Sequence, residues 1–348
     1  MSLYNYFIGF VFTLFQTPST DQKVEQIFKA LSDEEKVAQM IVTATGKLGK
    51  PKKEVLELVK NQKIGGVLLL NGTKDEFKKY VTEFNEIVKN NKGIPLIYSA
   101  DAEPSLINYK IKGTKTVKAT SFLQDTTECK DATLSISEDL LDIGILQNFA
   151  PVCDLTTKNI AIGNRSFGSD TLRVMTLSEV FINTSRSKGI MATAKHFPGH
   201  GYVKGDTHKN LVYIDGELKE LGVYKYLIAK DVPSIMVGHI AVRNNPKYDT
   251  QGLPATCSRL IVTDLLRKEL GFQGIIITDA MNMGGVQKVK NASLEAVKAG
   301  CDMILMPENE AQLIKDVVEL MQKDEQFKEQ IYESVKRILR YKVALGLL

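Results

Sequence analysis

The sequence predicts an α/β fold, a (β/α)8 TIM-type barrel formed as a single domain. Short runs of aliphatic and β-branched residues alternate along the chain with longer segments of helical period. Eight such runs fit into 348 residues, a usual length for an α/β barrel folded as one domain. A doubly wound open sheet is the alternative that the same alternation allows.

Eight apolar runs are predicted to be the strands. They lie at 38–42, 64–70, 94–99, 146–152, 189–195, 233–239, 274–278 and 302–306. Strands repeated in this way, with a helical segment after each, are typical of βα units around a parallel sheet.

Nine amphipathic segments are predicted to be helices. They lie at 52–61, 74–91, 132–143, 173–188, 217–230, 258–270, 292–299, 310–322 and 326–345. Ser137 and Asp139 are interpreted as start signals of the third helix, and the CSRL sequence at 257–260 as that of the sixth. No Gly/Ser-rich linker divides the chain, so residues 22–348 are predicted to form one catalytic domain.

Residues 1–21 form an N-terminal apolar segment that is interpreted as the remnant of a signal peptide. The sequence YFIGFVFTLF at 6–15 is apolar enough for a signal-peptide core, although no basic residue precedes it. It is too short to span a bilayer, so no stable membrane span is predicted. The segment weakly favours a periplasmic or secreted protein, and a cytoplasmic location is the alternative.

Composition excludes some partners. The chain has 45 Lys and Arg against 41 Asp and Glu, and no basic run interleaved with aromatic residues, so no nucleic-acid surface is predicted. Four widely spaced cysteines, at 129, 153, 257 and 301, form no CxxC motif and are expected to be buried thiols. No cofactor is predicted, and the oligomeric state is left unassigned.

Polar residues gather where the predicted strands end. In such a barrel the catalytic residues project from the carboxyl ends of the strands. Strands three to seven lead into Asp101 and Glu103, Asp154, Lys195 and His196, His239, and Asp279 respectively. All four histidines belong to this rim, which is therefore the candidate active site.

Asp279 follows a long apolar strand directly in the sequence GIIITDAMNMGG. An aspartate at such a place can merely cap the next helix. The apolar strand before it and the other polar groups on the same rim favour a catalytic carboxylate.

His208 lies in the sequence KHFPGHGYVKGDTHKNL at 195–211, two residues after Asp206. In an extended loop these two side chains share a side, so the carboxylate can orient the imidazole and stabilise its protonated form. Such a pair can carry a proton near neutral pH. A solvated loop with a casual ion pair is the alternative. Glycines 199, 201 and 205 suit a mobile lid.

Four further residues have competing interpretations. His196 and His200 are four residues apart, as in zinc motifs, but Pro198 and Gly199 disfavour the helix that such a site needs, so no metal is predicted. Lys195 is interpreted as a donor to a substrate hydroxyl, with a Schiff-base lysine as the alternative. Arg165 is expected to turn inward rather than form a surface salt bridge.

The sequence KHFPGHG, followed after four residues by DTH, resembles the signature of family 3 glycoside hydrolases of the β-N-acetylglucosaminidase branch. NRSFG, NFAPVCDL and TDAMNMGGV resemble its other landmarks, and the similarity extends from about 35 to 345. The resemblance implies that Asp279 is the nucleophile and that His208, held by Asp206, is the general acid and base. It also implies that Asp101, Arg165, Lys195 and His196 bind the hydroxyls of a terminal N-acetylglucosamine.

One departure from that pattern lies after the third strand, where DAEPSLINYK replaces the usual glycine pair. Pro104 and Ser105 are expected to alter the sugar subsite near Asp101. The implied activity is retaining, exo-acting cleavage of peptidoglycan fragments or chitooligosaccharides. The alternatives are a phosphorylase, another β-glycosidase of the family, a degenerate sugar-binding barrel, a class I aldolase and a metallohydrolase.

Overall fold

The computed structural model describes residues 18–156 and 159–348. Eight parallel strands form one sheet: β1 (Ile41–Thr45), β2 (Gly66–Leu69), β4 (Ile97–Ala100), β6 (Gln147–Asn148), β7 (Met191–Phe197), β9 (Ser234–Val237), β11 (Ile275–Thr278) and β12 (Ile304–Leu305). Neighbouring strands in the sheet follow one another in the chain, in the order β1, β2, β4, β6, β7, β9, β11. β12 returns to pair with β1, and one parallel bridge between Ile277 and Met303 joins it to β11.

The sheet is therefore a nearly closed barrel. All eight predicted strands are present, each overlapping its predicted run. The open doubly wound sheet does not fit, because its chain order reverses part-way across the sheet.

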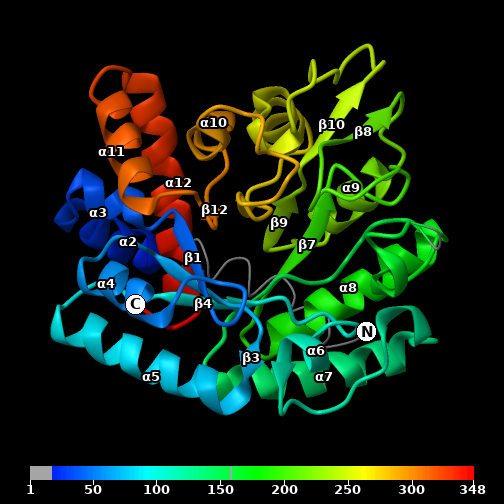
Figure 1. The fold of residues 1–348 in the computed structure, drawn as a ribbon, viewed down its shortest axis with the longest axis horizontal. Coiled ribbons are helices and arrows are strands. Elements are labelled where there is room, and N and C mark those ends of the chain that lie inside the picture. Colours follow the sequence, from blue (N-terminus) through cyan, green and yellow to red (C-terminus); the bar gives the residue numbers. More distant parts are fainter. Residues whose placement is uncertain (1–17, 157–158) are drawn as a thin grey trace.

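The helices lie outside the ring of strands (Figure 1). The nine that were predicted are α4 (Lys52–Lys60), α5 (Lys74–Asn90), α7 (Thr126–Ile143), α8 (Thr171–Ser187), α9 (Leu221–Ala229), η4 (Leu260–Glu269), α10 (Ala292–Ala299), α11 (Glu310–Met321) and α12 (Glu325–Ala344). η4 has the hydrogen-bond pattern of a π-helix. The short elements are α6 (Ile107–Lys110), η1 (Thr120–Phe122), η2 (Gly163–Arg165) and η3 (Ala255–Cys257), with the parallel pairs β3 (Gly72–Thr73) with β5 (Ile111–Lys112) and β8 (Val212–Asp215) with β10 (Ile240–Arg243).

The predicted start of α7 is wrong. The helix begins at Thr126, where Asp125 accepts hydrogen bonds from the backbone N–H groups of residues 127 and 128. Ser137 and Asp139 are buried inside the helix instead. Asp139 pairs with Lys74 at 2.6 Å, so its side chain serves a contact between helices.

Among the described residues before the first strand, which begin at residue 18, there are two helices: α2 (Pro18–Ala30) and α3 (Asp33–Ala38). α2 packs against α12, and Asp21 pairs with Arg340 at 2.9 Å. Residues 1–17 of the predicted leader lie outside the described residues, and residues 18–21 form the first turn of α2. The leader and its boundary at residue 21 stay predictions. No helix in the described part of the chain is long and apolar enough to cross a membrane.

Strand register places the two key carboxylates at the mouth of the barrel. Residues paired across parallel strands point to the same side of the sheet, and so do residues two apart in one strand. Asp101 lies two residues beyond Ser99, which pairs with Leu68, and Asp279 lies two residues beyond Ile277, which pairs with Met236. Asp101, Leu68, Met236 and Asp279 all line one pocket, so the inward rows of β4 and β11 run up to it.

Buried polar contacts hold the opposite end of the barrel. Asp302 accepts hydrogen bonds from Arg267 at 2.7 Å, from Arg337 at 2.5 Å and from the backbone N–H of Ile276 at 2.7 Å. These contacts tie η4 and α12 to β11. Asp279 directly follows β11, so these contacts fix the start of the strand that leads into this carboxylate.

The four cysteines are free and buried, as predicted. Burial raises the pKa of the Cys129, Cys153 and Cys257 thiols to about 12 and that of Cys301 well above its ordinary value. They contribute to the apolar core.

Candidate active site

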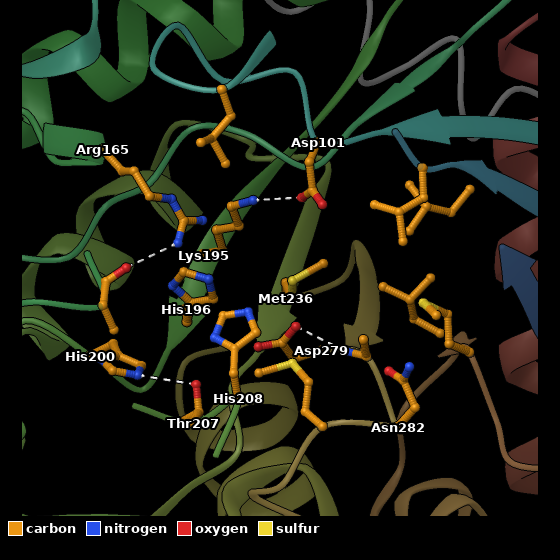
Figure 2. A pocket seen from close by; sticks show the side chains of 18 of the residues that line it. Asp101, Arg165, Lys195, His196, His200, Thr207, His208, Met236, Asp279 and Asn282 are labelled. Carbon is orange, nitrogen blue, oxygen red and sulfur yellow. Dashed lines mark hydrogen bonds and ion pairs between the residues drawn. The ribbon is translucent and has the colours of Figure 1, made fainter. Parts of the chain in front are cut away.

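A pocket of about 370 Å³ lies at the carboxyl ends of the strands. Six of the seven predicted site residues line it: Asp101, Arg165, Lys195, His196, His208 and Asp279. The seventh, Asp206, contacts His208. Asp279 and His208 lie at one end of the view in Figure 2, and Asp101, Lys195 and Arg165 lie at the other, with His196 between them.

Asp279 follows β11 without a break. Its backbone N–H donates to the carbonyl of Val237 at 2.9 Å, and its Oδ1 accepts from the backbone N–H of Ala280 at 2.8 Å. Burial opposes ionisation, but the nearby imidazoles of His239 and His196 and the Ala280 N–H hold the pKa of this carboxyl below its ordinary value. Asp279 therefore faces the pocket as a carboxylate.

His239 holds the backbone just after Asp279 in place. Its Nε2 lies 2.9 Å from the carbonyl oxygen of Ala280, and its Nδ1 lies 2.9 Å from Oγ1 of Thr256. Burial lowers the pKa of His239, which favours a neutral ring that donates from Nε2 to the Ala280 carbonyl. His239 is thus a buried histidine with a backbone partner, which fixes the residue after Asp279.

His208 lies on the loop between β7 and β8. Asp206 Oδ1 lies 2.8 Å from His208 Nδ1 and accepts from the His208 backbone N–H at 3.0 Å. The predicted contact is present, but it forms across a turn and not in an extended loop, because the Lys209 and Asn210 N–H groups donate to the Asp206 carbonyl. Burial opposes ionisation of Asp206, but these contacts hold the pKa of its carboxyl below its ordinary value. Because Nδ1 of His208 contacts Asp206, Nε2 is the ring nitrogen that can exchange a proton with a ligand in the pocket.

Two backbone hydrogen bonds hold the tip of this loop beside Asp279. The N–H groups of Gly284 and Gly285 donate to the carbonyls of His208 and Thr207, each at 3.0 Å. A Cβ atom on Gly284 would lie 2.2 Å from the carbonyl oxygen of Lys209, and one on Gly285 would lie 2.6 Å from Cβ of His239. Gly284 therefore lets the loop approach the Asp279 segment, and Gly285 lets this segment pack against His239. Opening of the loop as a lid stays a prediction.

Asp154, which follows β6, orients the histidine at the centre of the pocket. Its Oδ2 lies 2.7 Å from His196 Nδ1, and its Oδ1 accepts from the backbone N–H of His200 at 2.8 Å. Burial opposes ionisation of Asp154, but both histidines hold its pKa below the ordinary value. The contact leaves His196 Nε2 for a ligand. The sequence predicted that Asp154 lies on the rim, but not that it orients His196.

The far end of the pocket is a network of ion pairs. Lys195 Nζ lies 2.9 Å from Asp101 Oδ1 and 3.7 Å from Glu103 Oε2. Lys110 Nζ lies 3.8 Å from Asp101 Oδ2, and Arg165 Nε donates to Glu103 Oε1 at 2.5 Å. Burial opposes ionisation of Asp101, but Lys195 and Lys110 hold its pKa well below the ordinary value.

This network decides the alternative for Arg165 and bears on the one for Lys195. Arg165 turns inward and pairs with the fully buried Glu103, so the surface salt bridge is wrong. Its own burial opposes the charged form, but Glu103 raises the pKa of the Arg165 guanidinium above its ordinary value. Lys195 is engaged by two carboxylates, which favours a hydrogen-bond donor over an amine nucleophile.

The departure at Pro104 and Ser105 has a structural role. Ser105 Oγ donates to the carbonyl of Asn164 at 2.7 Å and accepts from the backbone N–H of Thr120 at 2.9 Å. Ser105 therefore ties the segment after β4 to η2, the short helix that ends in Arg165. These contacts hold Arg165 at the pocket.

His196 and His200 have separate hydrogen-bond partners. His196 binds Asp154, whereas His200 lies 3.3 Å from both Asn159 Nδ2 and Thr207 Oγ1 through its two ring nitrogens. Among residues 18–156 and 159–348, no three His, Cys, Asp or Glu side chains are grouped so that they could hold a metal ion.

The amino-acid sequence is similar to a family model and to known proteins. The family model described as the glycosyl hydrolase family 3 N terminal domain matches residues 32–341. A β-hexosaminidase of Glaesserella parasuis is 32% identical over 268 residues, which cover 73% of this chain and 76% of that protein. A β-hexosaminidase of Haemophilus influenzae is 30% identical over 269 residues, which cover 73% of this chain and 75% of that protein.

Solved structures show the same similarity. A glycoside hydrolase family 3 β-N-acetylglucosaminidase from Paenibacillus has a TM-score of 0.81 at 27% identity, covering 91% of this chain and 63% of that one. A β-N-acetylhexosaminidase from Beutenbergia cavernae has a TM-score of 0.80 at 25% identity, covering 91% of this chain and 99% of that one.

Proposed function

Because this chain belongs to glycosyl hydrolase family 3 and is therefore a glycoside hydrolase, we propose that it removes terminal β-linked N-acetylglucosamine with retention of configuration. The observation that carries this proposal is that Asp279, which follows β11, and His208, on the loop after β7, line one pocket together with groups suited to sugar hydroxyls. The β-hexosaminidase relatives support the same class of sugar.

In the first step, a carboxylate oxygen of Asp279 attacks the anomeric carbon. The bond from that carbon to the leaving oxygen breaks, and this oxygen takes the proton from Nε2 of His208. Asp206 stabilises the imidazolium before the transfer, because its carboxylate holds Nδ1. The products of this step are the free leaving group and a glycosyl ester of Asp279.

In the second step, water attacks the anomeric carbon of the ester. The neutral His208 imidazole accepts the proton from the water at Nε2, and the bond to Asp279 breaks to regenerate the carboxylate. Two inversions at the anomeric carbon give net retention. Retaining glycosidases usually employ two carboxylates, and here an imidazole takes the place of the second.

The far end of the pocket is suited to hydroxyl groups. Asp101 offers acceptor oxygens, whereas Lys195 and Arg165 offer charged donors, and hydrogen bonds to charged groups are the stronger ones. A volume of about 370 Å³ lies at the lower end of small-ligand pockets and fits one terminal sugar. These properties support exo-acting cleavage.

The surroundings of Asp279 support an acetamido group on the sugar. The substituent at C2 is adjacent to the anomeric carbon, so it must lie near the nucleophile. Asn282, Met236 and Met283 line this part of the pocket, and Figure 2 shows the first two close to Asp279. An amide side chain can hydrogen-bond the acetamido group, and the thioethers suit its methyl group.

The natural substrate is a peptidoglycan fragment or a chitooligosaccharide in this proposal. Phosphorolysis is the second candidate, because the group facing Asp279 is an imidazole. After proton transfer a neutral imidazole repels an incoming phosphate less than a carboxylate would. Phosphate would then replace water in the second step and give a sugar 1-phosphate.

The test compares two substrates with the same aryl leaving group, a β-N-acetylglucosaminide and a β-glucoside. We expect kcat/KM to be at least about 10²-fold higher for the N-acetylglucosaminide, because groups placed for the acetamido function stay unpaired with glucose. Equal or greater efficiency on the glucoside would overturn the sugar assignment. NMR of the first product should show the β-anomer, and added phosphate separates hydrolysis from phosphorolysis by the product formed.

Gly284→Ala should lower kcat/KM by about 10²-fold, because a displaced loop tip moves His208 away from the reacting bond. The added methyl group meets the carbonyl of Lys209 at 2.2 Å. Gly222→Ala in α9 is the matched control, since its Cβ would meet only Met175 Cε at 3.9 Å. Steady-state kinetics of both variants check the prediction, and wild-type turnover by Gly284→Ala would show that the backbone contact does not place His208.

A further inference from the structure

We infer that Glu220 is a positioning residue for the proposed general acid, because its buried carboxylate fixes the stem of the loop that carries His208. This inference rests on the proposed function. The stem is residues 199–201, directly after β7, and the tip is residues 207–209.

Glu220 lies immediately before α9, yet its side chain makes no capping hydrogen bond to that helix. It is only 3% exposed and reaches two other segments instead. Its Oε1 accepts from the backbone N–H of Leu155 at 2.5 Å, and the Gly201 N–H lies 3.2 Å from Oε1 and 3.0 Å from Oε2. One carboxylate thus joins the segment after β6, the stem of the loop and the start of α9.

The glycines of the stem fit this carboxylate closely. A Cβ atom on Gly199 would lie 2.3 Å from Glu220 Oε2, and one on Gly201 would lie 2.7 Å from Oε1. The stem therefore lies directly on the glutamate, with no room for a side chain. The contact with Glu220 gives Gly199 a physical reason, and Gly201 is required both by Glu220 and by the Leu155 carbonyl oxygen, which a Cβ atom there would meet at 2.5 Å.

The rest of the stem is held in the same way. Asp154 accepts from the His200 N–H at 2.8 Å, and Asn159 Nδ2 donates to the carbonyls of His200 at 2.7 Å and Val203 at 2.9 Å. The tip contacts Gly284 and Gly285 through the two backbone hydrogen bonds described above, and Thr207 Oγ1 lies 3.3 Å from Nε2 of His200 in the stem. His208 lies seven residues beyond Gly201, so a stem that shifts changes where the tip can reach.

The contacts of Glu220 require acceptor oxygens, because the backbone N–H groups of Leu155 and Gly201 point at them. Burial and the neighbouring Asp154 raise the pKa of its carboxyl to about 8, and these N–H groups oppose that shift. Its position at the start of α9 also favours the charged form. Glutamine cannot replace it fully, because one oxygen becomes an NH₂ group that faces the Gly201 N–H.

The experiment measures Glu220→Gln with two N-acetylglucosaminides, one with a dinitrophenyl leaving group and one with a sugar leaving group. The dinitrophenyl group needs no proton to depart, and the sugar does. We expect the rate constant of the first step, from single-turnover kinetics, to fall by about 10- to 10²-fold for the sugar glycoside, the scale of a misplaced catalytic group. For the dinitrophenyl glycoside the same rate constant should change by less than about 3-fold. A defect of folding alone would lower both equally.

Glu217→Gln is the matched control, because Glu217 is exposed and lies three residues earlier. It should behave as wild type. Glu220→Asp keeps the charge but shortens the side chain. It should show the same dependence on the leaving group, with a smaller loss of rate. It provides the same test if Glu220→Gln does not fold.

Two outcomes are distinguished by including His208→Ala in the same assay. If His208→Ala slows the first step of the sugar glycoside selectively and neither Glu220 variant does, the inference about Glu220 is overturned and the proposed function stands. If His208→Ala slows the first step of both substrates equally, the proposed acid role fails instead.

Discussion

Asp279→Asn is expected to lower kcat/KM by at least about 10⁴-fold, because an amide cannot form the glycosyl ester. The loss should be the same for sugar and dinitrophenyl leaving groups, since both need the nucleophile in the first step. Steady-state kinetics with N-acetylglucosaminides measure it. Asp264→Asn is the control: Asp264 forms an exposed ion pair with Lys268 on η4 and should keep wild-type turnover.

The pH dependence gives a second test of the same residue. Asp279 must be ionised to attack, so its contribution is present above its pKa in the folded protein and is lost as the pH falls through that value. This pKa lies below the ordinary 3.8. An acid limb of kcat/KM that has its midpoint above pH 4.5 and disappears in an Asp279 variant would contradict the description of the site.

His208→Ala should lower turnover of a sugar glycoside by about 10²- to 10⁴-fold, the usual effect of losing a general acid. The dinitrophenyl glycoside should lose far less in the first step, because its leaving group departs without a proton. Lys209→Ala removes the exposed neighbouring side chain and is the control. Rate constants for the first step, from single-turnover kinetics, make the comparison.

Equal losses on both substrates in the first step would exclude His208 as the acid. Azide supplies a positive test of the second step, because it attacks the ester without needing a base. If His208 is the base, azide should restore turnover of the dinitrophenyl glycoside by His208→Ala and give a β-glycosyl azide. It should not restore turnover by Asp279→Asn.

The sequence predicted the strands and the strand-end residues because these follow from local rules. Each strand is a short apolar run, and the carboxyl ends of parallel strands meet at one mouth. Asp101, Lys195, His196 and Asp279 needed no further information to be brought together. Asp206 and His208 could be paired by their spacing alone.

Contacts between distant segments could not be predicted. Glu220 is one of many glutamates in the sequence, and only the folded chain brings it to Gly201 and Leu155. Gly284 and Gly285 were part of a sequence pattern, but Gly284 is required by the backbone of the loop after β7 and Gly285 by the side chain of His239. Glu103 likewise gains its role from Arg165, which lies 62 residues away.

Two helical features show the same limit. The acidic stretch near 138 suggested a helix start, but Asp139 is used to bind Lys74 on α5, and the cap is Asp125. α2 and α3 were not predicted, because their stability depends on packing against α12 and α11.

The most direct test is mass spectrometry of the enzyme after reaction with an activated fluorinated N-acetylglucosamine glycoside, whose second step is slow. The account predicts that the peptide containing Asp279 gains the mass of one fluorosugar and loses it again on prolonged incubation in water. Attachment of the sugar to any other residue would contradict the account. So would turnover of this glycoside with an inverted product and no labelled enzyme.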